Sequence, residues 1–251
     1  MLTTDVLYSA AALGATSLLG SIIALTVKSM PHRLGDIFLG FCAGMMLGAS
    51  IVCLILPAVD ATAPTYWWTI AVGVAFGVAL IGFLDYVVPH LHRLTGLELE
   101  DHHSTMRVDR VLLFVIAIAI HKLPEGMATG IVYNGDVSQA NVVSFVIALQ
   151  NIPEGMVAIT PLLMLGMKWT RALVLALVIA VIEVVGVLSG YFIGDILSGV
   201  LPILLSAAGG AMLYVISDEM IPETHSHGYQ KQATYALICG LLLMIFIQKM
   251  S

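Results

Sequence analysis

Residues 173–182 read LVLALVIAVI, an uninterrupted apolar run in which polar and apolar positions do not alternate. A strand of a membrane β-barrel alternates between lipid-facing and lumen-facing residues, so this run favours a helix. It lies in an apolar window, Ala172 to Gly194, that contains one charged residue, Glu183. A helix that crosses a bilayer needs about 20 predominantly apolar residues. The window therefore predicts a transmembrane helix.

Further windows of similar length occur along the 251-residue chain. Those without charged residues are Val6 to Val27, Ile37 to Val59, Ala61 to Leu84, Ile196 to Ser217 and Gln232 to Gln248. Two others contain internal charges, Val111 to Tyr133 and Val137 to Met167. With 59% hydrophobic and 10% charged residues and a mean hydropathy of +1.00, the composition excludes a water-soluble globule. We expect an all-α polytopic membrane protein, an eight-transmembrane-helix bundle that forms one domain over residues 1–251.

Eight of the ten lysine and arginine residues lie in alternate loops between these windows, and the exceptions are Lys122 and, at the end of the last span, Lys249. The eight are Lys28, Arg33, Arg93, Arg107, Arg110, Lys168, Arg171 and Lys231. The intervening loops, residues 59–66, 134–141 and 194–202, contain neither residue type. Because cytoplasmic loops are enriched in lysine and arginine, we expect both termini outside. The longest cytoplasmic loop, residues 85–110, contains four histidines.

Charge and cysteine content argue against two other classes of protein. The formal net charge is −6, and no basic stripe of the kind that binds nucleic acid is present. The cysteines, Cys42, Cys53 and Cys239, lie inside predicted spans without CxxC pairing, so they indicate neither a disulfide framework nor a zinc finger.

Ionisable side chains inside the apolar windows are the strongest functional signal. A charge near the centre of a bilayer costs about 3 kcal/mol on insertion scales, so such residues usually serve a function. The fourth window contains His121, Lys122 and Glu125, and the next two contain Glu154 and Glu183. These residues predict a polar site within the membrane.

A repeated motif places ligand-type side chains on two of these helices. HKLPEG at residues 121–126 is matched by QNIPEG at residues 150–155. The first, second and fifth positions of each motif lie on one side of a helix and therefore converge. Carboxylate, imidazole and amide groups together suit a borderline divalent metal such as zinc. We interpret the two motifs as a cation site.

The paired Pro-Glu-Gly motifs, followed by Glu183, resemble the ZIP (ZRT/IRT-like) family of divalent metal transporters. Three further stretches share the resemblance: GFCAGMMLGAS at 40–50, FLDYVVPHLH at 83–92 and SDEMIPETH at 217–225. The resemblance implies eight spans with outside termini and an alternating-access movement. It also implies uptake of a divalent transition metal, zinc in the first place, into the cytoplasm through a site on the fourth, fifth and sixth helices. The protein would then be a multi-pass protein of the cell membrane, or of the inner membrane in a bacterium.

The resemblance also implies particular site residues. The primary metal site would consist of Met46, His121, Glu125, Gln150 and Glu154. In the family an adjacent second site shares the two motif glutamates and uses the positions of Lys122, Asn151 and Glu183. Asp60 is expected at the outer entrance. The cytoplasmic exit would use Asp85, His90, His92, Asp218, Glu219 and His225.

Lys122 departs from the pattern of the family, since members with two metals commonly have asparagine there. A protonated ammonium group has no lone pair with which to bind a metal. The charges of Glu125, Glu154 and Glu183 sum to −3, which one divalent ion and one lysine balance. We hypothesise that Lys122 replaces the second cation and holds Glu183 or Glu154 ionised, because buried charges persist only when paired.

Two alternatives use the same residues. An intramembrane metalloenzyme would bind a catalytic zinc, but the HExxH signature is missing and the predicted core holds no second histidine. A passive metal channel would be lined by the same ligands.

The expected partners are the bilayer and the transported ion, Zn²⁺ or else Cd²⁺, Fe²⁺ or Mn²⁺, and we expect no resident cofactor. The sequence leaves open the physiological metal, proton coupling, one or two metals per site, and whether the chain forms a homodimer.

Overall fold

The computed structural model describes residues 4–27, 30–87, 122–164 and 166–250. All regular secondary structure in these ranges is helical, which agrees with the all-α expectation. The α-helices are α1 (Thr4–Val27), α2 (His32–Gly48), α3 (Leu56–Asp60), α4 (Trp68–Val87), α7 (Val137–Met164), α8 (Trp169–Ile196), α9 (Leu201–Val215), α10 (Ile221–Thr224) and α11 (Gln230–Met250). Residues 122–132 form a further helix.

Six helical segments of the described ranges are long and apolar enough to cross a membrane. They are Thr4–Val27, His32–Asp60, Val137–Met164, Trp169–Ile196, Ser198–Thr224 and Gln230–Met250. The apolar part of α4, Trp68–Leu84, is shorter. Residues 111–121, nearly half of the fourth predicted span, lie outside the described residues. The helical membrane fold is therefore confirmed, while the count of eight spans stays a prediction.

Two of the differences between the predicted windows and the observed helices involve a change of helix type. The third window begins at Ala61, but α4 begins at Trp68 after a short 3₁₀ turn at Pro64–Tyr66. Absence of charge does not distinguish an apolar turn from a helix, which explains the error. The seventh window ends at Ser217, but the helix continues through a π-helical segment, Ile216–Met220, and then α10. Asp218 and Glu219 therefore lie within this helix and not beyond its end.

Each of the two π-helical segments precedes a proline. Ala49–Ile55 joins α2 to α3 before Pro57, and Ile216–Met220 joins α9 to α10 before Pro222. Proline lacks the N–H that an α-helix requires, and a local π turn can accommodate the lost hydrogen bond. Both long helices therefore remain continuous through their prolines.

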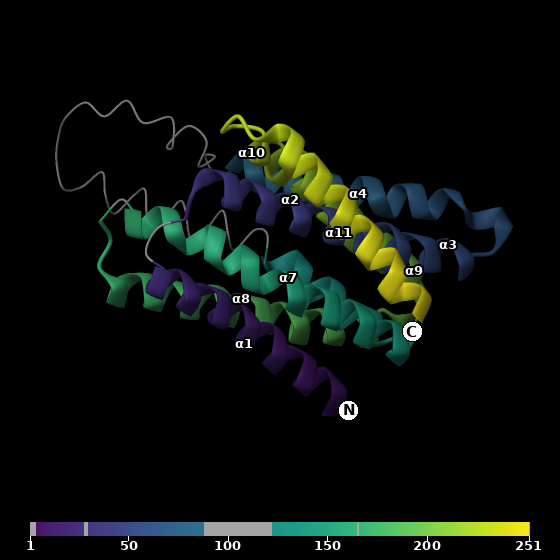
Figure 1. Ribbon diagram of the computed structural model, residues 1–251. Helices are drawn as coiled ribbons and strands as arrows, with labels where there is room; N and C mark the ends of the chain where they lie inside the picture. The colour runs from purple at the N-terminus through teal and green to yellow at the C-terminus, as the bar shows by residue number, and fades with distance from the viewer. Residues whose placement is uncertain (1–3, 28–29, 88–121, 165, 251) are drawn as a thin grey trace.

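The helices form two bundles (Figure 1). In the first bundle α1 packs on α7 and α8, and the helix of residues 122–132 packs on α8. In the second bundle α2 packs on α11 and α4 packs on α9. The main contact between the bundles is made by α2 and the following π segment against α7. Residues 122–126 of the first repeated motif and residues 150–155 of the second belong to the first bundle.

Close helix contacts in the first bundle depend on glycine. A Cβ atom at Gly126 would overlap the carbonyl oxygen of Glu183, and a Cβ atom at Gly155 would lie 2.8 Å from that of Ser17. Small residues allow helices in membranes to approach this closely. These two contacts bring the turn that contains Lys122 and Glu125 against α8, and the turn that contains Glu154 against α1.

The two ends of the molecule differ in their content of lysine and arginine. Both termini lie at the same end (Figure 1), where the described charged residues are Asp5, Asp60, Asp136, Asp195 and Lys249. The opposite end, at the starts of α2, α8 and α11, includes Arg33, Lys168, Arg171 and Lys231 beside Asp36, Asp218, Glu219 and Glu223. We call the first the acidic end and the second, which has most of the described lysine and arginine residues, the basic end.

Candidate metal site

The ammonium group of Lys122 lies at the centre of a cluster of polar side chains in the first bundle. Its Nζ atom donates to Glu125 Oε2 at 2.7 Å, to Asn151 Oδ1 at 2.6 Å and to Glu154 Oε2 at 2.8 Å. Glu183 Oε1 lies farther away, at 3.9 Å. An ammonium group has three N–H donors, so these three short contacts use all of them.

Two amide side chains extend this network to neighbouring helices. Gln150 Nε2 donates to Glu125 Oε1 at 3.1 Å. Asn151 Nδ2 donates to Glu183 Oε1 at 2.7 Å and to the Leu13 carbonyl at 3.2 Å. The network therefore joins α1, the helix of residues 122–132, α7 and α8.

The network is almost completely buried. Lys122, Glu125, Gln150, Asn151 and Glu183 are each no more than 2% exposed, whereas the side chain of Glu154 is 16% exposed. Removing charges from water is costly unless they are paired and hydrogen-bonded, and the contacts of Lys122 supply that pairing. Glu154 is thus the group of the network most open to an incoming ion.

Two oxygen atoms of the network have no hydrogen-bond partner among the described residues. They are Gln150 Oε1 and Glu183 Oε2, both buried. Buried polar atoms without partners are rare in proteins, and these two oxygen atoms are free to accept a contact from a cation. Amide and carboxylate oxygens are both metal ligands.

The second bundle faces this network through α2. The Cys42 thiol donates to the Gln150 carbonyl at 3.5 Å. Met46 is 1% exposed and lies one turn farther along α2, on the same side of the helix. The structure therefore places the expected thioether on the side of α2 that faces α7.

Other expected residues are separated from the network or lie outside the described residues. His121, His90 and His92 lie outside them, as does the side chain of Asp85 in α4. Asp60 is exposed at the end of α3, and Asp218 and His225 are exposed near α10, where Glu219 is half-buried. Within the described part of the chain, no group of three His, Cys, Asp or Glu side chains is arranged to hold a metal. Lys122 Nζ lies between Glu125 and Glu154, so the ammonium group takes the position in which a metal ion would contact both carboxylates.

A small cavity borders the network on the side of the basic end. Its volume is about 40 Å³, and it is lined by Ser17, Ser21, Lys122, Glu154, Gly155, Ala158 and Ile179. Ser17 and Ser21 lie in the second half of α1, Glu154 lies in the second half of α7, and Ile179 lies in the first half of α8. All three of these halves point to the basic end (Figure 1). Sequence patterns alone did not identify Ser17 and Ser21, because single serines in apolar helices are common packing residues.

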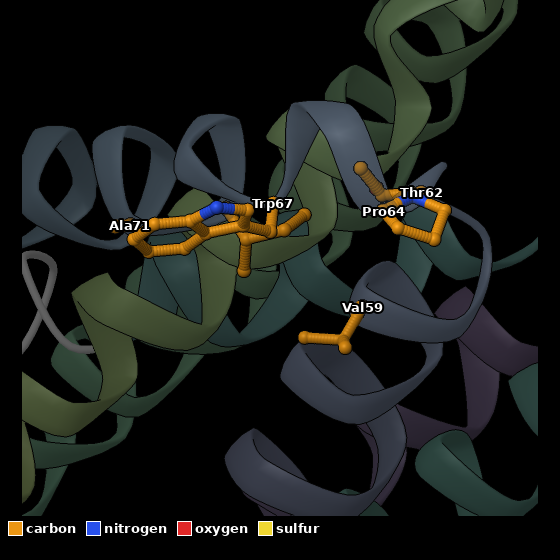
Figure 2. A pocket seen from close by; sticks show the side chains of 6 residues that line it. Val59, Thr62, Pro64, Trp67 and Ala71 are labelled. Atoms are coloured by element: carbon orange, nitrogen blue, oxygen red, sulfur yellow. The ribbon is translucent and has the colours of Figure 1, made fainter.

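A larger pocket lies away from this network, at the turn between α3 and α4 (Figure 2). Its volume is about 470 Å³, and its lining residues are Val59, Thr62, Pro64, Trp67, Ile70 and Ala71. The lining contains no carboxylate, imidazole or thiol, so it offers no metal ligand of the usual kinds. Size alone therefore does not identify the functional site.

A second polar cluster, at the basic end, was not found from the sequence. Asp36 is 3% exposed, and its Oδ1 atom lies 3.0 Å from His227 Nδ1. The His227 ring stacks on that of His32, with centroids 4.3 Å apart. His32 and Asp36 are four residues apart on α2, a spacing that could have indicated a shared face.

Comparisons with known proteins agree with these features. A family model described as the ZIP zinc transporter matches residues 89–248. The zinc transporter ZIPB of Bordetella bronchiseptica is 39% identical over 250 residues, which cover 96% of this chain and 79% of that protein. The zinc transporter GufA of Myxococcus xanthus is 33% identical over 241 residues, which cover 93% of this chain and 94% of that protein. The zinc transporter ZupT of Streptococcus mutans is 28% identical over 246 residues, with 92% and 91% covered.

Proposed function

This chain belongs to the ZIP family of zinc transporters and is a multi-pass membrane protein, and we propose that it carries zinc into the cytoplasm through the Lys122 network. The family consists of transporters, so the metalloenzyme alternative is wrong. The observation that carries the proposal is the group of three carboxylates, Glu125, Glu154 and Glu183, inside a bundle of membrane helices. Such a group is stable only with cations beside it.

The ion is proposed to bind Glu125, Gln150 and Glu154, together with Met46 and His121. The unpartnered Oε1 atom of Gln150 supports this set, since it is buried beside Glu125. Carboxylate, imidazole and thioether ligands together favour a borderline metal over magnesium or calcium. Zinc is therefore the expected cargo, and cadmium is a suitable probe.

Lys122 is proposed to take the place of a second metal ion. Its contacts with Glu125 and Glu154, and its 3.9 Å separation from Glu183, support that role. One divalent ion together with Lys122 balances the three carboxylates. Titration of the purified protein with Cd²⁺ should give one tightly bound ion per chain, and two tightly bound ions would refute the proposal.

The lysine and arginine residues at the basic end support an orientation of the protein in the membrane. The positive-inside rule assigns the basic end to the cytoplasm and the acidic end to the outside. The small cavity beside Glu154 then lies on the cytoplasmic side of the network, as expected for a state that releases metal. At the acidic end, Gln139 Nε2 donates to the Cys53 carbonyl at 2.8 Å and joins α7 to the second bundle. Exchange between this state and one that is open to the outside would constitute transport.

Uptake of zinc into proteoliposomes tests the proposal. The wild-type protein should show saturable uptake. Glu154→Ala should reduce uptake by roughly 100-fold or more, because losing even a residue that only hydrogen-bonds to a metal ligand lowers metal affinity or activity 10-fold to 100-fold. Asp5→Asn removes a carboxylate far from the network, in the first turn of α1, and should leave uptake unchanged. Uptake that does not saturate would favour the channel alternative. Normal uptake by a folded Glu154→Ala protein would exclude the proposed site.

A further inference from the structure

Lys122 and the proposed metal require the same two carboxylate groups, those of Glu125 and Glu154. The ammonium group holds Oε2 of both Glu125 and Glu154 within 2.8 Å. A divalent ion bound to these carboxylates would lie next to a positive charge in a buried site, where electrostatic repulsion is much stronger than in water. Metal and ammonium therefore cannot both hold these oxygens in the present arrangement.

Glu183 offers Lys122 another position. Its Oε1 atom is 3.9 Å from Nζ, and its Oε2 atom is buried and has no partner among the described residues. A shift of about 1 Å would bring the ammonium group within hydrogen-bonding distance of Glu183. The four-carbon stem of lysine is flexible enough for such a shift.

Asn151 already links the two positions. Its Oδ1 atom accepts from Lys122, while its Nδ2 atom donates to Glu183. The lysine could therefore keep its contact with Asn151 while it exchanges Glu125 and Glu154 for Glu183. In both arrangements each buried charge has an opposite charge beside it, which is the condition for burying charges at an acceptable cost.

We infer that Lys122 is a tethered cation that changes partners during transport: it holds Glu125 and Glu154 before the metal arrives and moves to Glu183 when the metal takes them. The inference rests on the proposed function and adds how the site is regulated. A lysine that returns to the same carboxylates competes with the metal and weakens its binding, which favours release. It also leaves the carboxylates paired when the protein returns without metal.

A double-mutant cycle tests the exchange. Cd²⁺ affinity for the first ion is measured by calorimetry on the purified wild-type protein, Lys122→Met, Glu183→Gln and the double variant. Lys122→Met removes the competitor and should bind Cd²⁺ about 10-fold tighter or more. Glu183→Gln removes the other position of the lysine and should weaken binding by about 5-fold or more in the wild-type background. In the Lys122→Met background the same change should have a much smaller effect.

The outcomes separate this inference from the proposed function. No Cd²⁺ binding by the folded wild-type protein would overturn both. Binding that Glu183→Gln weakens by the same factor in both backgrounds would overturn the exchange alone, because Glu183 would then act on the metal without the lysine. Unchanged or weaker binding by Lys122→Met would also overturn it. If the methionine variant does not fold, Lys122→Gln, which keeps a hydrogen-bond donor, replaces it in the cycle.

Discussion

The interior of the first bundle and the α2–α11 contact of the second bundle are built on different principles. Around Lys122, charged and amide side chains are buried and satisfy one another. Between α2 and α11, Gly40, Gly44 and Gly48 lie against Ala233, Leu237 and Met244. The Lys122 network depends on charge balance, and the α2–α11 contact depends on close packing. A site that binds and releases ions needs balanced charges, whereas a stable support needs close packing.

The largest effect on stability should come from removing the central charge of the first bundle. Lys122→Ala leaves the buried carboxylates Glu125 and Glu183 without a cation and should reduce stability by about 3–5 kcal/mol. Thermal unfolding of the metal-free protein measures this loss, and added Cd²⁺ should restore part of it. Lys231→Ala, at an exposed position, serves as the control and should change little. Equal unfolding temperatures for the two variants would contradict the view that charge balance stabilises this bundle.

A larger side chain without a charge should reduce the stability of the second bundle. A Cβ atom at Gly44 would overlap the Leu237 carbonyl, so Gly44→Ala must push α11 away from α2. Overpacking of this kind costs about 1–3 kcal/mol. Gly199→Ala is the matched control, since nothing lies within 4 Å of a Cβ atom there. If thermal unfolding showed the two alanine variants to be equally stable, close packing of α2 on α11 would not be needed.

The smallest of these effects concerns the contact between the bundles. Gln139→Leu removes the donor to the Cys53 carbonyl and should cost about 1 kcal/mol, the usual contribution of one hydrogen bond. It should also loosen α7 against α2 at the acidic end, so that the buried Cys53 thiol reacts faster with a maleimide reagent. The rate at Cys53 in the wild-type protein is the reference. An equal rate in the variant would mean that this hydrogen bond does not hold the bundles together.

Much of the fold and several residues of the network could be predicted from local patterns. The run LVLALVIAVI and the windows like it predict membrane helices, because helix insertion depends on hydropathy summed over about 20 residues. Charges within those windows pointed to Glu125, Glu154 and Glu183, which the structure brings around Lys122. The start of α4 was not predicted, since turns without charge resemble helices in composition. The helix that ends with α10 continues beyond its predicted window because Asp218 and Glu219 interrupt the apolar run but not the helix.

Other features depend on contacts between residues far apart in the chain. The pairing of Asp36 with His227 joins α2 to the segment between α10 and α11, and no local pattern of the sequence contains it. The contact of Cys42 with the Gln150 carbonyl likewise requires the packing of α2 on α7. The ligand role of Met46 and His121 stays a prediction.

The amino-acid sequence alone predicts a bundle of membrane helices with ionisable groups in its interior, because hydropathy and charge are properties of short segments. Which of those groups Lys122 holds depends on the tertiary structure. Its three short contacts involve both motifs, and its distance to Glu183 depends on how closely the helix of residues 122–132 approaches α8 at Gly126. Electrostatic pairing in a buried site changes within about 1 Å, and helix packing sets distances on that scale.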